Sequence, residues 1–470
     1  MLIVIAAAVC AGRAWPAAIT VQGRKLLVDG AQFNIKGVDY SPVPVGSDWH
    51  YDWADVPSIY NSDLPLIRSM GANTVRTYQE NNISQAFLDS AYQNGIYVIV
   101  GYGQNLWGQD FTNPATRAQF VNDFASFINT YKGNPAVLMW CFGNEVEEHT
   151  ASKAAWYTLL KEAADKAHSI DPNHPITTAN QDITELGVSA LNADDTTLSS
   201  LDVWGVNVYK GKDFSQAFFT EMSTRTAKPF FLSEWGCDAY NGDKGAESQS
   251  LQASYIGAQW AGIGANLTSN GKACLGGLVF EWCDEWWKGD TIALTTSTIG
   301  GGGVKGSSYH DTENDWVNSA YTDDIYMNEE WWGLVSVAAG TALRTPRLAY
   351  YALKDLWNPS QAVASSSVTT LIQNEVKNYP NPLIAGRDVT RVEFTVAGAP
   401  QLEVVIFDLR GGKVFQQDNI VDLGSGLMSA DWNGRDENNN IVPAGLYICR
   451  VKAKTPDREE TKYRKIAVVK

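Results

Sequence analysis

Two kinds of apolar pattern alternate along most of the chain. Short continuous apolar runs, such as residues 96–103 (IYVIVGYG) and 229–236 (PFFLSEWG), are each followed by a longer stretch, such as residues 114–133, in which apolar residues recur every three or four positions. Continuous runs are typical of parallel strands covered on both faces, and the longer stretches are typical of amphipathic helices. The pattern therefore predicts a series of β/α units.

Eight such units are expected between residues 34 and 357. The expected strands are residues 34–40, 73–78, 96–103, 136–145, 175–180, 201–209, 229–236 and 276–282. The expected helices are residues 62–71, 83–95, 114–133, 151–171, 214–226, 248–267 and 345–357, with one poorly marked helix after the fifth strand. Eight units predict an α/β fold of the (β/α)8 (TIM) barrel type. The alternative, a doubly wound open sheet, usually has a glycine fingerprint after its first strand, and residues 37–46 (GVDYSPVPVG) do not have one.

Two further segments belong to this region. Residues 19–33 predict a hairpin that turns at Asp29-Gly30. A long insertion, Cys283 to Ala342, separates the eighth strand from its helix and contains five tryptophans and the glycine run Gly300 to Gly303. No Lys-Ser/Thr pair follows these glycines in the phosphate-binding register, so we interpret the insertion as a loop. A loop at this position projects over the carboxyl ends of the strands, where barrel active sites lie.

The composition changes three times along the chain. Residues 1–18 join an apolar run to small residues and predict a secretory signal peptide. Residues 19–357 are the expected barrel, residues 358–378 form a Ser/Ala/Val-rich linker, and residues 379–470 alternate apolar and polar positions between turn clusters such as NGRDENNN. That alternation predicts a small all-β sandwich of the immunoglobulin-like kind. No other segment is long and apolar enough to span a bilayer.

Charge and cysteine content narrow the range of partners. The net charge of −16, from 36 basic and 52 acidic residues, argues against a nucleic-acid or anionic-membrane partner, because phosphate binding needs clustered Lys and Arg. An aromatic content of 11% with 17 tryptophans suits sugar rings, although large cores also use tryptophan. The six cysteines show no CxxC pair, so neither a zinc site nor a disulfide framework is expected, and one isolated bridge stays open. A monomer that acts on a neutral polymer is the expectation.

The ends of the expected strands supply the candidate chemistry, because barrel enzymes place catalytic groups there. Two of these ends, on the fourth and seventh strands, are glutamates that finish strongly apolar runs. The candidates are Asp39, Tyr40, Arg76, Tyr102, Asn144, Glu145, Asn180, Asn207, Tyr209, Glu234, Glu281 and Trp282.

Paired carboxyls across a barrel mouth suit cleavage of a glycosidic bond. A buried carboxylate is costly unless it is paired or hydrogen-bonded, so Glu145 and Glu234 at such positions point to function. One carboxyl protonates the leaving oxygen, and the other attacks the anomeric carbon or activates water. The five histidines lie at no strand end and no GxSxG motif occurs, which argues against zinc and serine-triad chemistry. Neither a metal nor a cofactor is expected.

Two more glutamates follow Glu145 closely. Glu147 and Glu148 lie beyond the expected strand, where solvated charge or the start of a helix is the simple interpretation. The alternative is that Glu147 or Glu148 lines the active-site cleft.

The two catalytic candidates lie in segments that resemble a known clan. FGNE (residues 142–145) and LSEWG (residues 232–236) resemble the signature of the retaining β-glycosidases on (β/α)8 barrels. The resemblance implies that Glu145 is the acid/base and Glu234 the nucleophile of a double displacement, with the carboxyls about 5 to 5.5 Å apart. It also implies roles for other positions: Asn144 binds the sugar 2-hydroxyl, Tyr209 hydrogen-bonds Glu234, Arg76 holds the charge of the nucleophile, and Trp282 floors the subsite.

Within the clan, several segments are most similar to the fungal β-1,3-glucanosyltransferases, followed by the family 2 β-glycosidases. These segments are IKGVDYSP, GANTVRTY, GNEV, SEWGC, and GGLVFEW with the later WWGLVSV. The cysteine-rich tail of the fungal enzymes is absent from this sequence. The resemblance implies a secreted β-glycoside hydrolase or transglycosylase that acts on a polysaccharide or oligosaccharide. A β-1,3-type glucan is the leading substrate hypothesis. The alternatives are an endo-β-1,4-glucanase or mannanase of the same clan and a catalytically weak surface polysaccharide-binding protein.

The C-terminal region carries a second resemblance. NYPNPL, VIFDLRGGKV and the terminal KIAVVK resemble the immunoglobulin-like domains related to the flagellar hook-capping protein and the sorting domains of bacterial type IX secretion. The resemblance implies a bacterial protein that is secreted or held at the cell surface, with the secretion machinery as a partner. A passive sandwich and a carbohydrate-binding module are the alternatives, and the few aromatic residues mostly fall at core positions.

Overall fold

The computed structural model describes residues 18–103, 105–288, 316–317, 326–338, 344–358, 371–396, 400–417, 420–423, 426–455 and 458–470. The chain divides into two compact units, one ending at Trp357 and the other starting at Asn358. Residues 1–17 of the expected signal peptide, and most of the insertion with its glycine run, lie outside the described residues. Among the described helices, none combines the length and the apolar character needed to cross a bilayer.

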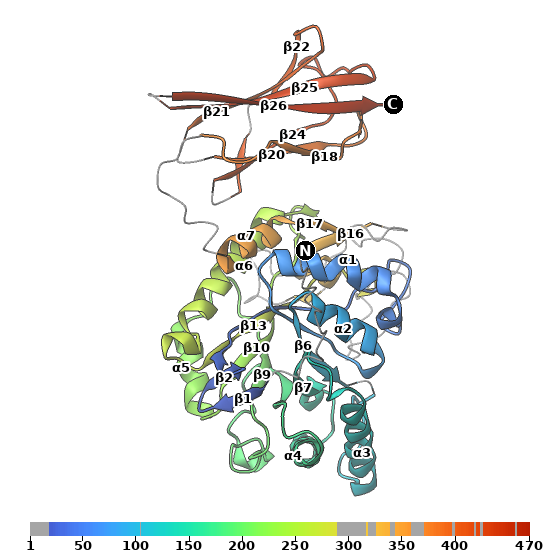
Figure 1. Ribbon diagram of the computed structural model, residues 1–470, viewed down its shortest axis with the longest axis vertical. Helices are drawn as coiled ribbons and strands as arrows, with labels where there is room; N and C mark the ends of the chain where they lie inside the picture. Colours follow the sequence, from blue (N-terminus) through green and yellow to red (C-terminus); the bar gives the residue numbers. More distant parts are fainter. Residues whose placement is uncertain are drawn as a thin grey trace, which may run out of the picture. The chain divides into compact units, whose positions relative to one another are not determined.

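Eight parallel strands of the first unit close into a barrel (Figure 1). In chain order they are β4 (Ile35–Asp39), β5 (Thr74–Arg76), β6 (Tyr97–Tyr102), β7 (Val137–Asn144), β8 (Ile176–Gln181), β9 (Trp204–Asn207), β10 (Phe230–Trp235) and β13 (Cys274–Val279). Each strand pairs with the next along the chain, and β13 closes the ring against β4. The predicted (β/α)8 barrel is confirmed.

Helices surround this barrel, as Figure 1 shows. They are α1 (Pro57–Ser69), α2 (Gln85–Gln93), α3 (Pro114–Tyr131), α4 (Lys153–Ile170), α5 (Gln216–Arg225), α6 (Gln249–Ala265) and α7 (Leu348–Trp357). Serine hydroxyls accept a backbone N–H at three helix starts, from Ser84, Ser152 and Ser215, which satisfies groups that the first turn leaves unpaired.

The fifth unit departs from the sequence prediction. Between β8 and β9 the only helical segment is the 3-10 turn η4 (Ser189–Leu191), so the poorly marked helix expected there is absent. Gly187 and Asn192 take positive φ angles of 79° and 63°, which break a helix. Leu186 and Leu198 are buried and cover the barrel without a helix.

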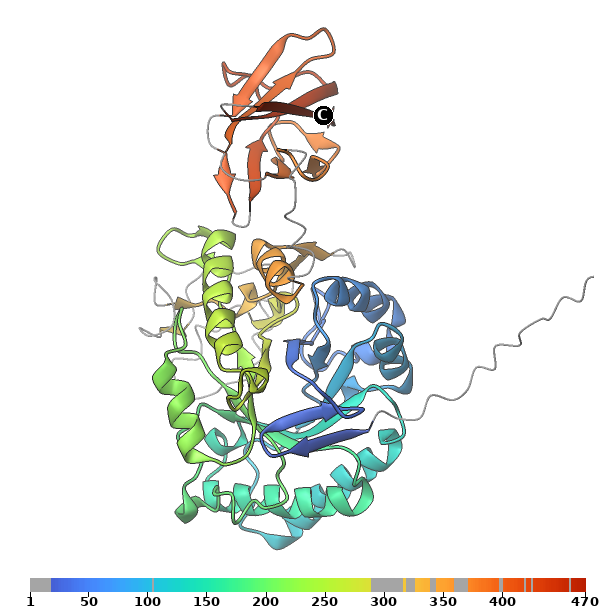
Figure 2. The same ribbon diagram turned by 60° about the vertical axis from the view of Figure 1, so that its left-hand side comes forward.

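A small N-terminal sheet covers the end at which the barrel strands begin. Strands β1 (Ile19–Gln22), β2 (Lys25–Val28) and β3 (Ala31–Gln32) pair antiparallel, and the predicted turn at Asp29-Gly30 joins the last two. Leu26 and Val28 pack in one cluster with Ile35 and Leu275 at the starts of barrel strands. Figure 2 shows the dark-blue β1–β2 pair lying against the barrel.

Short antiparallel strand pairs lie at the opposite end of the barrel, where the barrel strands end. Strands β11 (Tyr240–Asn241) and β12 (Ala246–Glu247) form a hairpin between β10 and α6. The described ends of the insertion contribute β14 (Trp316–Val317), β15 (Tyr326–Met327), β16 (Val335–Val337) and β17 (Arg344–Pro346), together with the 3-10 turns η6 (Trp286–Lys288) and η9 (Glu329–Trp331).

The second unit is all-β, as predicted. One sheet has the order β18-β20-β24-β23 and the other β19-β26-β25-β21-β22, and both contribute to a hydrophobic cluster that includes Trp432 and Cys449. The strands are β18 (Lys377–Tyr379), β19 (Leu383–Ile384), β20 (Thr390–Thr395), β21 (Gln401–Phe407), β22 (Lys413–Gln417), β23 (Val421–Asp422), β24 (Leu427–Trp432), β25 (Gly445–Thr455) and β26 (Arg458–Val469). The five described cysteines of the chain are buried free thiols, so none of them forms a bridge.

Candidate active site

A buried arginine organises the carboxyl ends of the barrel strands. Arg76, at the end of β5, donates from Nη1 to Asp39 Oδ1 at 2.9 Å and to Glu234 Oε1 at 3.1 Å. Its Nη2 donates to Asn144 Oδ1 at 2.6 Å. Four strand ends therefore meet at one guanidinium group, which is 1% exposed. A fixed fork of donors of this kind positions carboxylates precisely enough for chemistry.

Glu234 lies in a set of hydrogen-bond donors. Besides Arg76, the hydroxyl of Tyr78 donates to its Oε1 at 2.9 Å and that of Tyr209 to its Oε2 at 2.8 Å. Burial, followed by the nearby Asp39 and Glu234 carboxylates, raises the pKa of Tyr78 well above its usual value, and burial and Glu234 do the same for Tyr209. Both phenols therefore stay protonated and remain donors, which suits an anionic carboxylate at position 234.

Glu145 occupies a different environment. Asn207 Nδ2 donates to its Oε1 at 2.8 Å. Burial, and then the charge of Glu234, raises the pKa of Glu145 to about 8, while the bond from Asn207 acts in the opposite direction. Near neutral pH this carboxyl holds its proton, as a general acid must.

The backbone that presents Glu145 needs particular residues. Glu145 has φ 50°, in the left-handed region, and Gly143 before it has φ 84°. A Cβ at Gly143 would lie 2.6 Å from the indole of Trp156, so only glycine fits. The strained left-handed conformation of Glu145 is of the kind that proteins keep at functional sites.

Two asparagines connect the glutamates. Asn144 Oδ1 accepts from Arg76 and, at 3.1 Å, from Asn207 Nδ2, while Ser233 Oγ donates to Asn207 Oδ1 at 2.7 Å. A continuous network therefore runs from Glu145 through the two amides and Arg76 to Glu234. Within the described residues, Asn144 Nδ2 donates no hydrogen bond, so it is available to a ligand.

Glu281 lies beside this network in a charged neighbourhood. It is 1% exposed, and burial, with the nearby Glu285 carboxylate next in importance, raises its pKa well above the usual value. Lys288 pairs with Glu285 at 2.9 Å and with Glu329 at 3.1 Å, and its ammonium lies 4.4 Å from the centre of the Phe280 ring. The Lys288–Glu329 pair joins the two described ends of the insertion at the site.

Four sequence candidates lie elsewhere. Strand side chains alternate between the two faces, and these four point to the outer face, between the barrel and its helices. The expectation that these four side chains bind substrate is therefore corrected. Tyr40 donates to Asp63 of α1 at 3.1 Å, and Asn180 Nδ2 donates to the hydroxyl of Tyr157 in α4 at 2.9 Å. The ring of Tyr102 stacks on that of Phe142 at 5.6 Å, and the ring of Trp282 lies 6.4 Å from that of Tyr350 in α7. Trp282 is 0% exposed, so it offers no face to a sugar.

Tyr78 and Trp332 were not among the sequence candidates for the site. Tyr78 lies two positions after Arg76, and the same alternation that excludes Tyr40 would have indicated that it shares the face of Arg76. Trp332 packs edge-on against Tyr209 at 5.0 Å and against Phe280 at 5.2 Å. It comes from the insertion, so no strand pattern could have placed it.

The two glutamates after Glu145 differ from each other. Glu147 is 1% exposed in the 3-10 turn η3 (Val146–Glu148) and accepts the backbone N–H of Gln181, so the expectation of a solvated charge was wrong for it. Burial raises its pKa to about 8. Glu148 is exposed and pairs with Lys153, as expected for a solvated charge.

The fold and this geometry define a class: a (β/α)8-barrel enzyme with two carboxyls at the mouth of the barrel. The family model described as glucanosyltransferase, glycoside hydrolase family 72, matches residues 8–286. The match covers more than half of the chain, and the chain belongs to this family. The C-terminal unit lies outside the matched range.

Curated relatives agree with the family. The 1,3-β-glucanosyltransferase gas2 of Schizosaccharomyces pombe is 24% identical over 64% of this chain and 67% of its own, and gas5 of the same yeast is 29% identical over 62% and 58%. GAS5 of Saccharomyces cerevisiae is 26% identical over 54% and 53%. The chain thus spans between half and two thirds of the length of these relatives. All three are fungal, which does not support the bacterial source expected from the C-terminal sequence.

Solved structures share the fold. A family 2 β-galacturonidase from Eisenbergiella tayi has a TM-score of 0.53 at 20% identity, covering 73% of this chain and 54% of its own. The β-glucuronidase of Bacteroides uniformis has a TM-score of 0.54 at 13% identity, covering 96% and 48%. At these identities the likeness concerns the fold alone.

Proposed function

We propose that the protein is a β-1,3-glucan transglycosylase that works by double displacement with net retention. One observation carries the proposal: the two mouth carboxyls have opposite environments, a protonated Glu145 and a Glu234 surrounded by three donors. Two carboxyls in such different environments supply the acid and the nucleophile of a retaining reaction. Membership of the glucanosyltransferase family supports the transfer, and the 1,3-β-glucanosyltransferases among its relatives support the β-1,3-glucan.

In the first step Glu234 attacks the anomeric carbon and Glu145 gives its proton to the departing glycosidic oxygen. A glycosyl ester on Glu234 forms, and the leaving chain departs as an alcohol. Arg76 and the two tyrosine hydroxyls hold the attacking carboxylate in place, and Asn144 Nδ2 donates to the sugar 2-hydroxyl. In the second step Glu145, now a base, removes a proton from the hydroxyl of an incoming glucan, which attacks the ester with overall retention.

The remaining assignments belong to the same proposal. Asp39 and Glu281 are as buried as Trp282, so they act through neighbouring side chains, Asp39 through Arg76, which donates to it at 2.9 Å. The protein works outside the cell. The C-terminal unit is an immunoglobulin-like sorting or attachment domain, supported by its YPNP segment and its two-sheet, all-β architecture. The sorting route of that unit and its secretion partner rest on resemblance.

Azide rescue with an activated β-1,3-glucan aryl glycoside tests the two roles. Glu234→Ala loses turnover, and azide, which fits the space of the missing carboxylate, restores it and yields the α-glycosyl azide. Glu145→Ala keeps the nucleophile, so azide attacks the glycosyl ester and yields the β-glycosyl azide. Nuclear magnetic resonance of the products separates the two outcomes.

Glu148→Gln is the matched control, since it removes an exposed glutamate near Glu145 and should leave turnover unchanged. Near-normal activity in Glu234→Ala would contradict the proposal. Chromatography of an unactivated oligosaccharide incubated with the wild type tests transfer, because products longer than the substrate form only when a sugar is the acceptor.

A further inference from the structure

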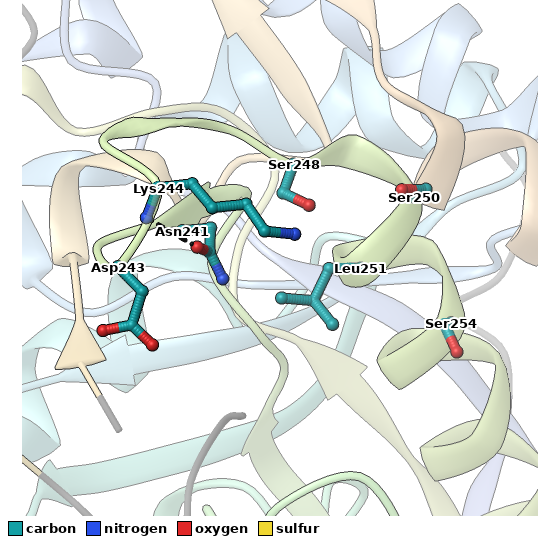
Figure 3. A pocket seen from close by; sticks show the side chains of 7 residues that line it. All are labelled: Asn241, Asp243, Lys244, Ser248, Ser250, Leu251 and Ser254. Carbon is teal, nitrogen blue, oxygen red and sulfur yellow. Dashed lines mark hydrogen bonds between the residues drawn. The ribbon is translucent and has the colours of Figure 1, made fainter. Parts of the chain in front are cut away.

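The loop between β10 and α6 contains a cavity apart from the paired glutamates. Its volume is about 460 Å³, within the range of roughly 300 to 1,000 Å³ that is usual for ligand sites. Figure 3 shows the side chains that line it. They are Asn241, Asp243, Lys244, Ser248, Ser250, Leu251 and Ser254.

One wall of the cavity is a well-anchored hairpin. In the β11–β12 pair, Tyr240 is opposite Glu247 and Asn241 is opposite Ala246. The Tyr240 ring stacks on Trp331 of η9 at 5.0 Å, and Glu247 accepts from Arg347 Nε at 2.8 Å. The hairpin is therefore fixed to the insertion and to the start of α7, and its inner wall is preorganised for a ligand.

An amide faces the cavity from a buried position. Asn241 is 5% exposed, and its Oδ1 accepts the backbone N–H of Lys244 at 2.9 Å. Figure 3 shows its Nδ2 group pointing into the cavity between the Lys244 side chain and Leu251. No described residue accepts a hydrogen bond from this Nδ2. An amide donor on the cavity wall that no described residue engages can donate to an acceptor on a ligand.

The rest of the lining indicates the chemistry of that ligand. Asp243 and Lys244 carry opposite charges, so the cavity favours neither an anion nor a cation. Three serine hydroxyls from the start of α6 both donate and accept, and Leu251 supplies one apolar contact. Mixed donors and acceptors around a small apolar surface match a neutral polyhydroxylated ligand, which is the character of a glucan.

Packed aromatic contacts connect the cavity to the catalytic residues. Trp331, which stacks on Tyr240, is followed in the chain by Trp332, which packs on Tyr209. Tyr209 in turn donates to Glu234. The hairpin itself follows β10, the strand that carries Glu234.

We propose that this cavity is a secondary binding site for a neutral glucan chain and holds a part of the polymer that is not being cleaved. The inference rests on the proposed function for the identity of the polymer. A long chain then gains affinity from a second point of attachment, whereas a short oligosaccharide bound at the glutamates gains none.

Two variants remove the secondary site by different means. Ser250→Trp fills the cavity from an exposed position of α6, and Asn241→Asp keeps the acceptor for the Lys244 N–H but replaces the amide donor with a carboxylate. Ser126→Trp, at an exposed serine of α3, is the matched control. KM and kcat are measured with a long soluble β-1,3-glucan and with a short activated oligosaccharide.

In both variants we expect KM for the long glucan to rise by about threefold to tenfold, because one or two hydrogen bonds to the polymer are lost. We expect kcat to stay unchanged. The short substrate and the control keep wild-type constants. An unchanged KM for the long glucan, or an equal change for the short one, would overturn the inference.

Failure of the proposed function has a different outcome, because the wild type would then turn over neither substrate. The cavity is tested in that case by calorimetric titration of the wild type and Ser250→Trp with the long glucan. Binding that Ser250→Trp weakens supports the site, and equal binding or no binding overturns it.

Discussion

Burial first, and then single charges around Glu145, set the protonation state on which its chemistry depends. Glu234 and Glu329 favour its neutral form, whereas Arg76 and the hydrogen bond from Asn207 favour its ionised form. The balance leaves the pKa at about 8, so the group is both an acid at neutral pH and a usable base one step later.

The pH profile of kcat/KM tests this balance. Glu145 must be protonated to act on the free substrate, so activity should fall as the pH rises through about 8. Glu329→Gln removes a negative charge that raises the pKa, and the alkaline limb should therefore move to lower pH. Glu148→Gln should leave the limb in place. A limb that stays at its wild-type position in Glu329→Gln would contradict the assignment of Glu145 as the acid.

Glu147 predicts a pH dependence of stability. Burial raises its pKa from 4.5 to about 8, so between these values the folded state holds a proton that the unfolded state has lost. Stability therefore falls as the pH rises through this window, by about 1.4 kcal/mol for each unit of pKa difference. Glu147→Gln cannot ionise and keeps an acceptor for the Gln181 N–H.

Urea unfolding at pH 5 and pH 8 measures the effect. The free energy of unfolding of Glu147→Gln should decline less between the two pH values than that of the wild type. The exposed Glu148→Gln should decline as the wild type does. Equal declines in all three proteins would show that Glu147 ionises normally in the folded state.

At the scale of elements, a buried ion pair fixes the insertion to the barrel. Arg347, at the start of α7, donates to Asp284 Oδ2 at 2.8 Å and to the carbonyl of Gly333 at 2.7 Å. Gly333 N–H donates to the same aspartate at 3.0 Å. Trp332, which packs on Tyr209, precedes this glycine, so the ion pair helps to position an aromatic residue of the site.

Arg347→Ala should cost about 3 kcal/mol in the free energy of unfolding, because it removes the guanidinium that neutralises the buried Asp284 carboxylate. Asp284→Asn in the same chain should recover part of that loss by removing the charge. Lys161→Ala breaks a half-exposed pair with Asp165 in α4 and should cost only about 0.5 kcal/mol. Denaturant melts compare the variants, and similar losses for Arg347→Ala and Lys161→Ala would contradict a structural role for the buried pair.

At the scale of the whole molecule, the chain consists of two units with separate hydrophobic cores. A chain that ends at residue 358 should therefore fold and keep its kcat/KM on short oligosaccharides within about twofold, since catalysis needs only the barrel. Calorimetry of the full chain should show two transitions, and that of the shortened chain should show the barrel transition alone. A shortened chain that cannot fold would mean that the second unit stabilises the first.

The sequence by itself determined the barrel, its strands and the two glutamates at its mouth. Buried parallel strands need continuous apolar runs, and burying a carboxylate at the end of such a run costs free energy unless the group is paired or has a function. Both features can therefore be recognised in a short stretch of sequence. The prediction of a helix after β8 was wrong, because Gly187 and Asn192 take positive φ angles that end a helix, and the apolar periodicity there was weak.

Only the tertiary structure decided which strand-end side chains face the mouth of the barrel and which face the helices. A shift of one position exchanges the two faces, and the contacts of these residues separate Asp39 from Tyr40 and Glu281 from Trp282. It also decided that Trp332 of the insertion packs on Tyr209 beside Glu234, and that Glu147 is buried while Glu148 is exposed. These outcomes depend on contacts between residues far apart in the chain, which no local pattern encodes.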